Sequence, residues 1–184
     1  MDGDVALVAR LKPGEALGDR VMKVNHAGEQ GAVCIYRAQR WIATVVTPSL
    51  VSELAENQAH EERHRAVFAA ELSRRGARRC RSYWLCAIGG TTLGVITAPF
   101  GRRAIAATTV AVEQVVLRHL DAQRMALRNL DAEAVAAIDN IARDESEHHD
   151  AALHTLGKPT LPLQLLMTVV SISTETVIWL GMRL

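Results

Sequence analysis

The 184-residue chain has few aromatic residues, few cysteines and almost no net charge. Phe, Tyr and Trp make up only 4% of the residues, so Ala, Val, Leu and Ile must fill the core. This composition favours closely packed helices over a β-sandwich. The cysteines, Cys34, Cys80 and Cys86, are odd in number and form no C-x-x-C pair, which argues against a disulfide framework and fits a reducing compartment. A formal net charge of +1 disfavours a nucleic-acid-binding protein, so we expect no nucleic-acid partner.

The amino-terminal sequence, MDGDVALVARLKPGE, lacks the pattern of an export signal. It has no basic segment followed by an apolar one, and it is neither rich in Arg and Ser nor poor in acidic residues. We therefore expect a bacterial-type chain without a targeting peptide. Hydrophobic residues make up 49% of the sequence, which is enough to build one core and excludes disorder as the main state.

Proline and glycine breaks divide the chain into helical segments. The breaks at Pro13-Gly14, Thr47-Pro48 and Gly76 predict helices over about 15–46 and 48–75, which form a helical hairpin over 15–76. A second hairpin is predicted over 102–156, with Asp131 as the N-cap of its second helix. An apolar, glycine-rich crossover spans 77–101, and a final apolar helix spans 161–182. We expect these segments to form a single all-α domain over residues 1–184.

The two hairpins contain the same acidic and histidine pattern at the same spacing. Glu29 is followed 32 residues later by Glu61, with His64 three residues beyond it. A second set repeats this spacing 84 residues further along the chain: Glu113, Glu145 and His148. Each pair of glutamates has its midpoint close to a predicted turn, so its two members should face one another at one height in an antiparallel hairpin. Each E-x-x-H pair should share one helix face and point at one metal ion.

Electrostatics also favour a metal site. Glu113 is the only charged residue in the apolar run AIAATTVAVEQVVL, where a lone buried carboxylate costs several kcal/mol unless a cation compensates it. Two divalent metal ions would neutralise four such carboxylates, and two neutral imidazoles would complete the ligand set. This is the di-iron or di-manganese pattern of ferritin-like four-helix bundles. His149 is also within reach of Glu145 at i+4, but the repeat selects His148.

Two apolar segments lie outside the predicted four-helix bundle. The segment 83–100 contains three glycines and a proline and is flanked by arginines, which suits it to a membrane interface with anionic headgroups. The final helix has one polar stripe on an otherwise apolar cylinder, made of Gln164, Thr168, Ser171 and Glu175. Burial against the bundle or against a dimer partner, and a solvated loop for the arginines, are the alternatives to membrane contact. The expected fold is thus a ferritin-like four-helix bundle with two additional apolar, membrane-interface helical segments.

Several motifs resemble those of the demethoxyubiquinone hydroxylases of ubiquinone biosynthesis. They are the run Asn25-His26-Ala27-Gly28-Glu29, both E-x-x-H pairs, Val112-Glu113 followed by His119, the run 144–150 (DESEHHD) and the ending Ile178-Trp179-Leu180. The resemblance extends from about Arg20 to the carboxyl end.

The resemblance implies a peripheral membrane enzyme on the cytoplasmic face of the cell membrane. Such an enzyme is a di-iron, O₂-dependent monooxygenase that hydroxylates the ring of a polyprenyl methoxy-methyl benzoquinol. It implies two iron ions per chain, a membrane-embedded quinol substrate, a lipid-binding partner in some organisms, and NADH, a reductase or the quinol as electron source; a homo-oligomer is a further expectation. The implied iron ligands are Glu29, Glu61, His64, Glu113, Glu145 and His148, with Glu61 and Glu145 bridging.

Two further residues are candidates for catalytic roles. His119 matches a histidine near the active site of the family, although Leu120 follows it where some members have a Tyr. Asp144 directly precedes Glu145 and is placed to orient the imidazole of His64 from the opposite hairpin. The alternative functions are a ferritin-like iron-storage or peroxide-detoxifying protein and a structural membrane-associated bundle whose acids form salt bridges.

Overall fold

The structure, a computed structural model, describes residues 8–184. Met1 to Leu7, the first half of the segment for which we expect no export signal, lie outside the described residues. The described residues form six α-helices and two 3₁₀ turns and contain no strand, which confirms the all-α fold class. The helices are α1 (Leu17–Val46), α2 (Val51–Arg74), α3 (Tyr83–Thr97), α4 (Arg102–Leu127), α5 (Ala132–Leu156) and α6 (Leu161–Gly181), with 3₁₀ turns at Pro48–Leu50 and Ala98–Phe100.

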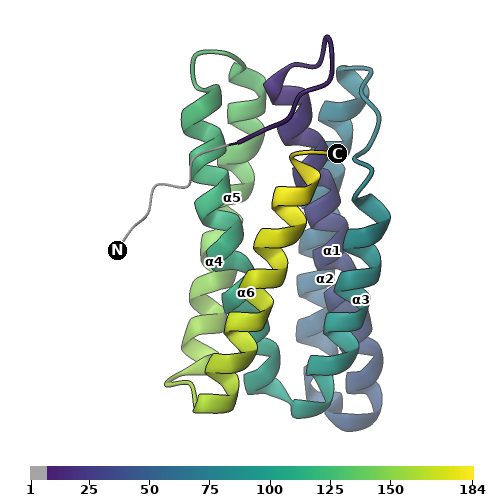
Figure 1. Ribbon diagram of the computed structural model, residues 1–184. Helices are drawn as coiled ribbons and strands as arrows, with labels where there is room; N and C mark the ends of the chain where they lie inside the picture. Colours follow the sequence, from purple (N-terminus) through teal and green to yellow (C-terminus); the bar gives the residue numbers. More distant parts are fainter. Residues whose placement is uncertain (1–7) are drawn as a thin grey trace.

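Two antiparallel hairpins, α1–α2 and α4–α5, form the four-helix bundle (Figure 1). The second helix of the first hairpin starts with a 3₁₀ turn at Pro48 instead of the predicted α-helical turn, because the Leu50 N–H donates to the Thr47 carbonyl oxygen, three residues earlier, at 3.0 Å. In the second hairpin the Asp131 carboxylate accepts a hydrogen bond from the Ala134 N–H at 3.0 Å, so it caps α5 as predicted. Large apolar side chains such as Phe68, Leu127 and Ile138 fill the interior.

The two remaining helices lie outside the bundle, α3 against α1 and α6 against α4 (Figure 1). Glycine makes the contact between α1 and α3 close. A Cβ atom at Gly94 would lie 2.5 Å from the Ile35 carbonyl oxygen, and a Cβ at Gly90 would collide with the Gly31 backbone. By contrast, Gly89 on the exposed side of α3 has no atom within 4 Å of a Cβ position.

The outer surface of α3 and α6 is apolar. Trp84, Ile88 and Phe100 are 61%, 66% and 76% exposed, and α6 exposes Leu165 and Ile172 to a similar extent. Both segments, Tyr83–Phe100 and Leu161–Gly181, are long and apolar enough to cross a membrane. They are unlike the core helices, since most of their surface lies outside the packed interior.

The polar stripe of α6 is divided between α4 and solvent. Ser171 donates a hydrogen bond to the Ala111 carbonyl oxygen of α4, and Glu175 pairs with Arg118 and His119 of the same helix. Gln164 and Thr168 are exposed. The polar residues nearer the carboxyl end therefore hold α6 on the bundle, while its apolar side stays outward.

Candidate metal centre

Four of the six predicted ligands lie within one small cluster in the bundle interior. Ligand atoms of Glu29, Glu61, His64 and Glu145 all lie within 4.8 Å of one another, and all four residues are buried. The residues come from α1, α2 and α5, so the repeat has folded its two halves against each other.

The other two predicted ligands adjoin this cluster. His148 Nδ1 lies 3.5 Å from a Glu61 oxygen and 3.4 Å from a Glu145 oxygen. Glu113 is buried and close enough to Glu145 for a hydrogen bond, and Glu29 and Glu61 are placed in the same way. The facing glutamate pairs in both hairpins therefore have the geometry that the turn midpoints predict.

Each imidazole presents Nδ1 to the carboxylates. His64 Nδ1 lies 2.9 Å from Glu145, 3.7 Å from Glu61 and 4.0 Å from Glu29. Glu61 and Glu145 are thus each in contact with both His64 and His148, which suits them to a position between two metal ions. His149 lies instead against Asp150, at 3.1 Å, in agreement with the choice of His148 by the repeat.

The carboxylates have shifted pKa values. Burial and the nearby Glu145 and Glu61 carboxylates raise the pKa of Glu29 well above its ordinary value, and burial together with Glu145 does the same for Glu113. Burial also raises the pKa of Glu61, with repulsion from Glu145 in the same direction. Four ionised carboxylates in this space would repel one another strongly, so the cluster favours any bound positive charge.

The imidazoles and Glu145 shift in the opposite sense. Burial opposes a charged His64, but the hydrogen bond to Glu145 and the nearby Glu61 carboxylate outweigh it and raise the pKa of His64 to about 11. The hydrogen bond to Glu145 raises the pKa of His148. Burial likewise opposes ionisation of Glu145, but hydrogen bonds from His148 and His64 outweigh it and lower its pKa to about 2. Protons on the imidazoles thus balance the anionic Glu145.

The donor set fits hard divalent cations that also accept imidazole. Carboxylate oxygens suit Fe(II) and Mn(II), and two imidazole nitrogens are compatible with both ions. Glu61 Oε1 is buried and has no hydrogen-bond partner among the described residues, so it is available as a metal ligand. The residues present can therefore hold two such ions.

Outer partners hold the far nitrogen of each imidazole. His64 Nε2 lies 3.2 Å from the Asp144 carboxylate, the contact for which Asp144 was selected from the sequence. His148 Nε2 lies 3.0 Å from His60 Nδ1, a partner that sequence reasoning missed. The position of His60, directly before Glu61, corresponds in the repeat to that of Asp144, and this was the signal that could have found it.

His119 lies at the contact between α4 and α6. Its Nε2 lies 2.7 Å from Glu175, while its Nδ1 is buried without a hydrogen-bond partner among the described residues. The structure therefore pairs His119 with a residue of the outer apolar helix, and its ring is not part of the four-residue cluster.

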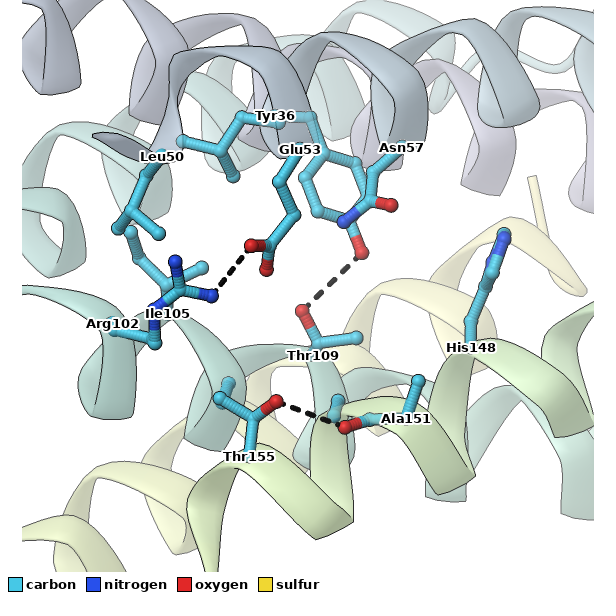
Figure 2. A pocket seen from close by; sticks show the side chains of 13 residues that line it. Tyr36, Leu50, Glu53, Asn57, Arg102, Ile105, Thr109, His148, Ala151 and Thr155 are labelled. Carbon is cyan, nitrogen blue, oxygen red and sulfur yellow. Dashed lines mark hydrogen bonds and ion pairs between the residues drawn. The ribbon is translucent and has the colours of Figure 1, made fainter. Parts of the chain in front are cut away.

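A cavity of about 210 Å³ lies between the bundle helices and extends to His148, one of the six predicted ligands (Figure 2). His148 lies at one side of this cavity, and the exposed ion pair between Arg102 and Glu53, at 2.5 Å, lies at another. Tyr36 and Thr109 are hydrogen-bonded to each other across it, with 3.3 Å between their hydroxyl oxygens. The lining comes from the four bundle helices and the turn at Leu50, and no residue of α3 or α6 contributes to it.

Known proteins are similar to this chain over most of its length. Residues 16–181 match the family described as "Ubiquinone biosynthesis protein COQ7". The chain belongs to this family. Among its relatives, the "NADPH-dependent 3-demethoxyubiquinone 3-hydroxylase, mitochondrial" of Dictyostelium discoideum is 33% identical over 175 residues, which cover 90% of this chain and 76% of the relative.

Bacterial and mammalian relatives match over a similar length. The "3-demethoxyubiquinol 3-hydroxylase" of Rhodospirillum rubrum is 32% identical over 91% of this chain and 79% of its own. The mitochondrial NADPH-dependent relative of Mus musculus is 28% identical over 90% of this chain and 77% of its own. Membership of the COQ7 family therefore applies to nearly the whole chain, both hairpins and both apolar helices included.

Proposed function

We propose that this COQ7-family protein is a di-iron, O₂-dependent monooxygenase that hydroxylates the ring of 3-demethoxyubiquinol, a polyprenyl methoxy-methyl benzoquinol. One observation carries the proposal: the duplicated Glu and E-x-x-H pattern comes together as a buried cluster inside the bundle of a COQ7-family chain. The relatives named as 3-demethoxyubiquinol 3-hydroxylases support the choice of substrate. We also propose that residues 1–184 act as a single domain made of the two hairpins, the crossover and the final helix.

Six side chains would hold the two iron ions: Glu29, Glu61, His64, Glu113, Glu145 and His148. The contacts of Glu61 and Glu145 with both imidazoles support a bridging role for these two carboxylates. Bound iron would supply electrons to O₂ and so make hydroxylation of the ring possible.

The residues around the cluster orient the ligands and exclude water. Asp144 accepts a hydrogen bond from His64 Nε2–H, which directs Nδ1 toward the carboxylates. Burial of Glu29, Glu61, Glu113 and Glu145 keeps bulk water from the reacting centre. The unpartnered Nδ1 of His119 supports a role as proton acceptor, with Nε2–H donating to Glu175.

The apolar helices support a peripheral position on a membrane. A prenyl tail costs about 0.8 kcal/mol for each CH₂ that leaves the bilayer, so the protein must approach its substrate there. The exposed apolar sides of α3 and α6 would contact lipid. Arg78, Arg79 and Arg81 would meet anionic headgroups. They line an open recess of about 490 Å³ near the start of α1, in which Lys23 pairs with Glu15. We place the protein on the cytoplasmic face of the cell membrane.

The relatives and the exposed apolar helices also indicate an electron donor and partner proteins. The NADPH-dependent relatives favour a nicotinamide dinucleotide as reductant, either NADPH or NADH. A lipid-binding protein of ubiquinone biosynthesis and a second copy of this chain are the partners that the exposed apolar helices suit.

The test is complementation of cells that lack their own demethoxyubiquinol hydroxylase. This chain should remove the accumulated demethoxy precursor and restore ubiquinone, both measured by mass spectrometry of extracted lipids. Glu113→Ala should lose bound iron and activity together, whereas Glu147→Ala, which removes an exposed glutamate of α5, should retain both. Unchanged precursor levels with large iron loading per chain would instead identify an iron-storage or peroxide-detoxifying protein.

A further inference from the structure

His60 and Asp144 occupy equivalent positions in the two halves of the chain. Each directly precedes the glutamate of its E-x-x-H pair, and they are separated by the same 84 residues as the proposed ligands. One position carries an imidazole and the other a carboxylate. The two halves therefore differ in residue type at this pair of positions, whereas the six proposed ligands are the same in both.

The contacts of the two residues are also equivalent. Asp144 Oδ2 lies 3.2 Å from Nε2 of His64 in the opposite hairpin, and His60 Nδ1 lies 3.0 Å from Nε2 of His148 in the opposite hairpin. The centroids of the His60 and His148 rings are 5.0 Å apart, and the rings are tilted by 51°, so the contact is between ring edges and not a stack. In both cases the nitrogen that remains, Nδ1, faces the carboxylate cluster.

We propose that His60 is the positioning residue of His148, as Asp144 is of His64, and that this difference makes the two metal positions unequal. The inference rests on the proposed two-metal centre. When His148 binds a metal through Nδ1, its Nε2 carries the proton and must donate it. His60 Nδ1 then accepts, which fixes His60 as the neutral tautomer with its own proton on Nε2.

A carboxylate and a neutral imidazole are acceptors of different strength. The charged Asp144 makes the stronger hydrogen bond and raises the basicity of His64 as a ligand, whereas His60 gives His148 orientation with little added charge. The metal ion next to His64 should therefore bind more tightly, and the ion next to His148 should bind second. In the iron-loaded protein, the same difference should make Fe(III) more stable beside His64.

Co(II) titration of the metal-free protein, followed by visible absorption, tests the inference. The unmodified protein should bind two Co(II) ions in two distinguishable steps. His60→Leu removes the acceptor and should weaken the second step by about 10–100-fold while leaving the first unchanged. Asp144→Leu should weaken the first step. His154→Leu, which alters an exposed histidine of α5, is the matched control and should change neither.

Two conservative variants separate orientation from simple packing. In His60→Asn the side-chain oxygen takes the place of Nδ1, so second-step affinity should return to within a few-fold of the original. His60→Asp restores the repeat and should bring the two affinities together. A paramagnetic NMR spectrum of the Co(II) protein should show an Nε2–H resonance of His148 whose exchange with solvent is slow in the unmodified protein and in His60→Asn, and fast in His60→Leu.

Equal affinities at both sites in the unmodified protein would overturn the inference, as would unchanged Co(II) binding in His60→Leu. Loss of both steps to the same extent, without recovery in His60→Asn, would show that His60 only supports the fold. A stoichiometry below two in the unmodified protein would overturn the two-metal function itself, and with it this inference.

Discussion

Two adjacent glycines of α3, Gly89 and Gly90, should respond in opposite ways to the same substitution. At Gly90 an added methyl group would collide with the backbone of Gly31 in α1, and a backbone atom cannot move aside as a flexible side chain can. Overpacking of this kind costs about 1–3 kcal/mol. At Gly89 nothing lies within 4 Å of the new Cβ, so Gly89→Ala gains about 1 kcal/mol from helix propensity.

The difference between the two variants should therefore be about 2–4 kcal/mol, the sum of the overpacking cost and the propensity gain. Urea denaturation of the metal-free protein, followed by circular dichroism, measures both free energies of unfolding. Hydrogen exchange should also be faster in α3 of Gly90→Ala and unchanged in α5. If Gly90→Ala were as stable as Gly89→Ala, with α3 equally protected, the close contact between α1 and α3 would be wrong.

Three further perturbations test other contacts. Asp131→Ala removes the cap of α5 and the ion pair with Arg75, so it should lower the free energy of unfolding by about 1–2 kcal/mol in the same urea assay. The control Asp139→Ala, on the exposed side of α5, should have little effect. Because the pKa of His64 is raised to about 11, the stabilisation of the metal-free protein by protonated His64 is complete below pH 6.5 and is lost as the pH rises toward 11. Co(II) binding at pH 7 should therefore release protons. Calorimetry in buffers of different ionisation enthalpy detects this release. The double variant Arg78→Ala/Arg81→Ala should bind phosphatidylglycerol vesicles about 30-fold more weakly in a sedimentation assay, because each arginine contributes about 1 kcal/mol of binding free energy. An equal loss in the control Arg128→Ala/Arg143→Ala would show that net charge alone determines binding.

The helices and the ligand cluster could be predicted because both depend on local rules. Proline and glycine breaks predict helix ends close to the observed ones, because the proline ring fixes φ and glycine adopts the positive φ found at Gly76, Gly101 and Gly157. The spacing of Glu29, Glu61 and His64 predicted their meeting because equal distances from a turn bring residues to one height in a hairpin. The close approach of α3 to α1 was beyond this reasoning, because it depends on which faces of two helices meet after the crossover at residues 77–101.

Residue type alone predicts only one of the two residues, Asp144 and His60, that contact the outer nitrogens of the ligand imidazoles. A carboxylate is the expected acceptor for a ligand histidine, so the sequence indicates the role of Asp144, whereas the residue type of His60 does not indicate such a role. The position of His60 in the repeat does indicate this role, because a residue 84 positions before Asp144 occupies the equivalent place in the other hairpin. The symmetry of the fold determines where this side chain lies, and its identity gives the two imidazoles different partners. In a duplicated bundle, the positions at which the copies differ are therefore where unequal behaviour of two similar metal ions must arise.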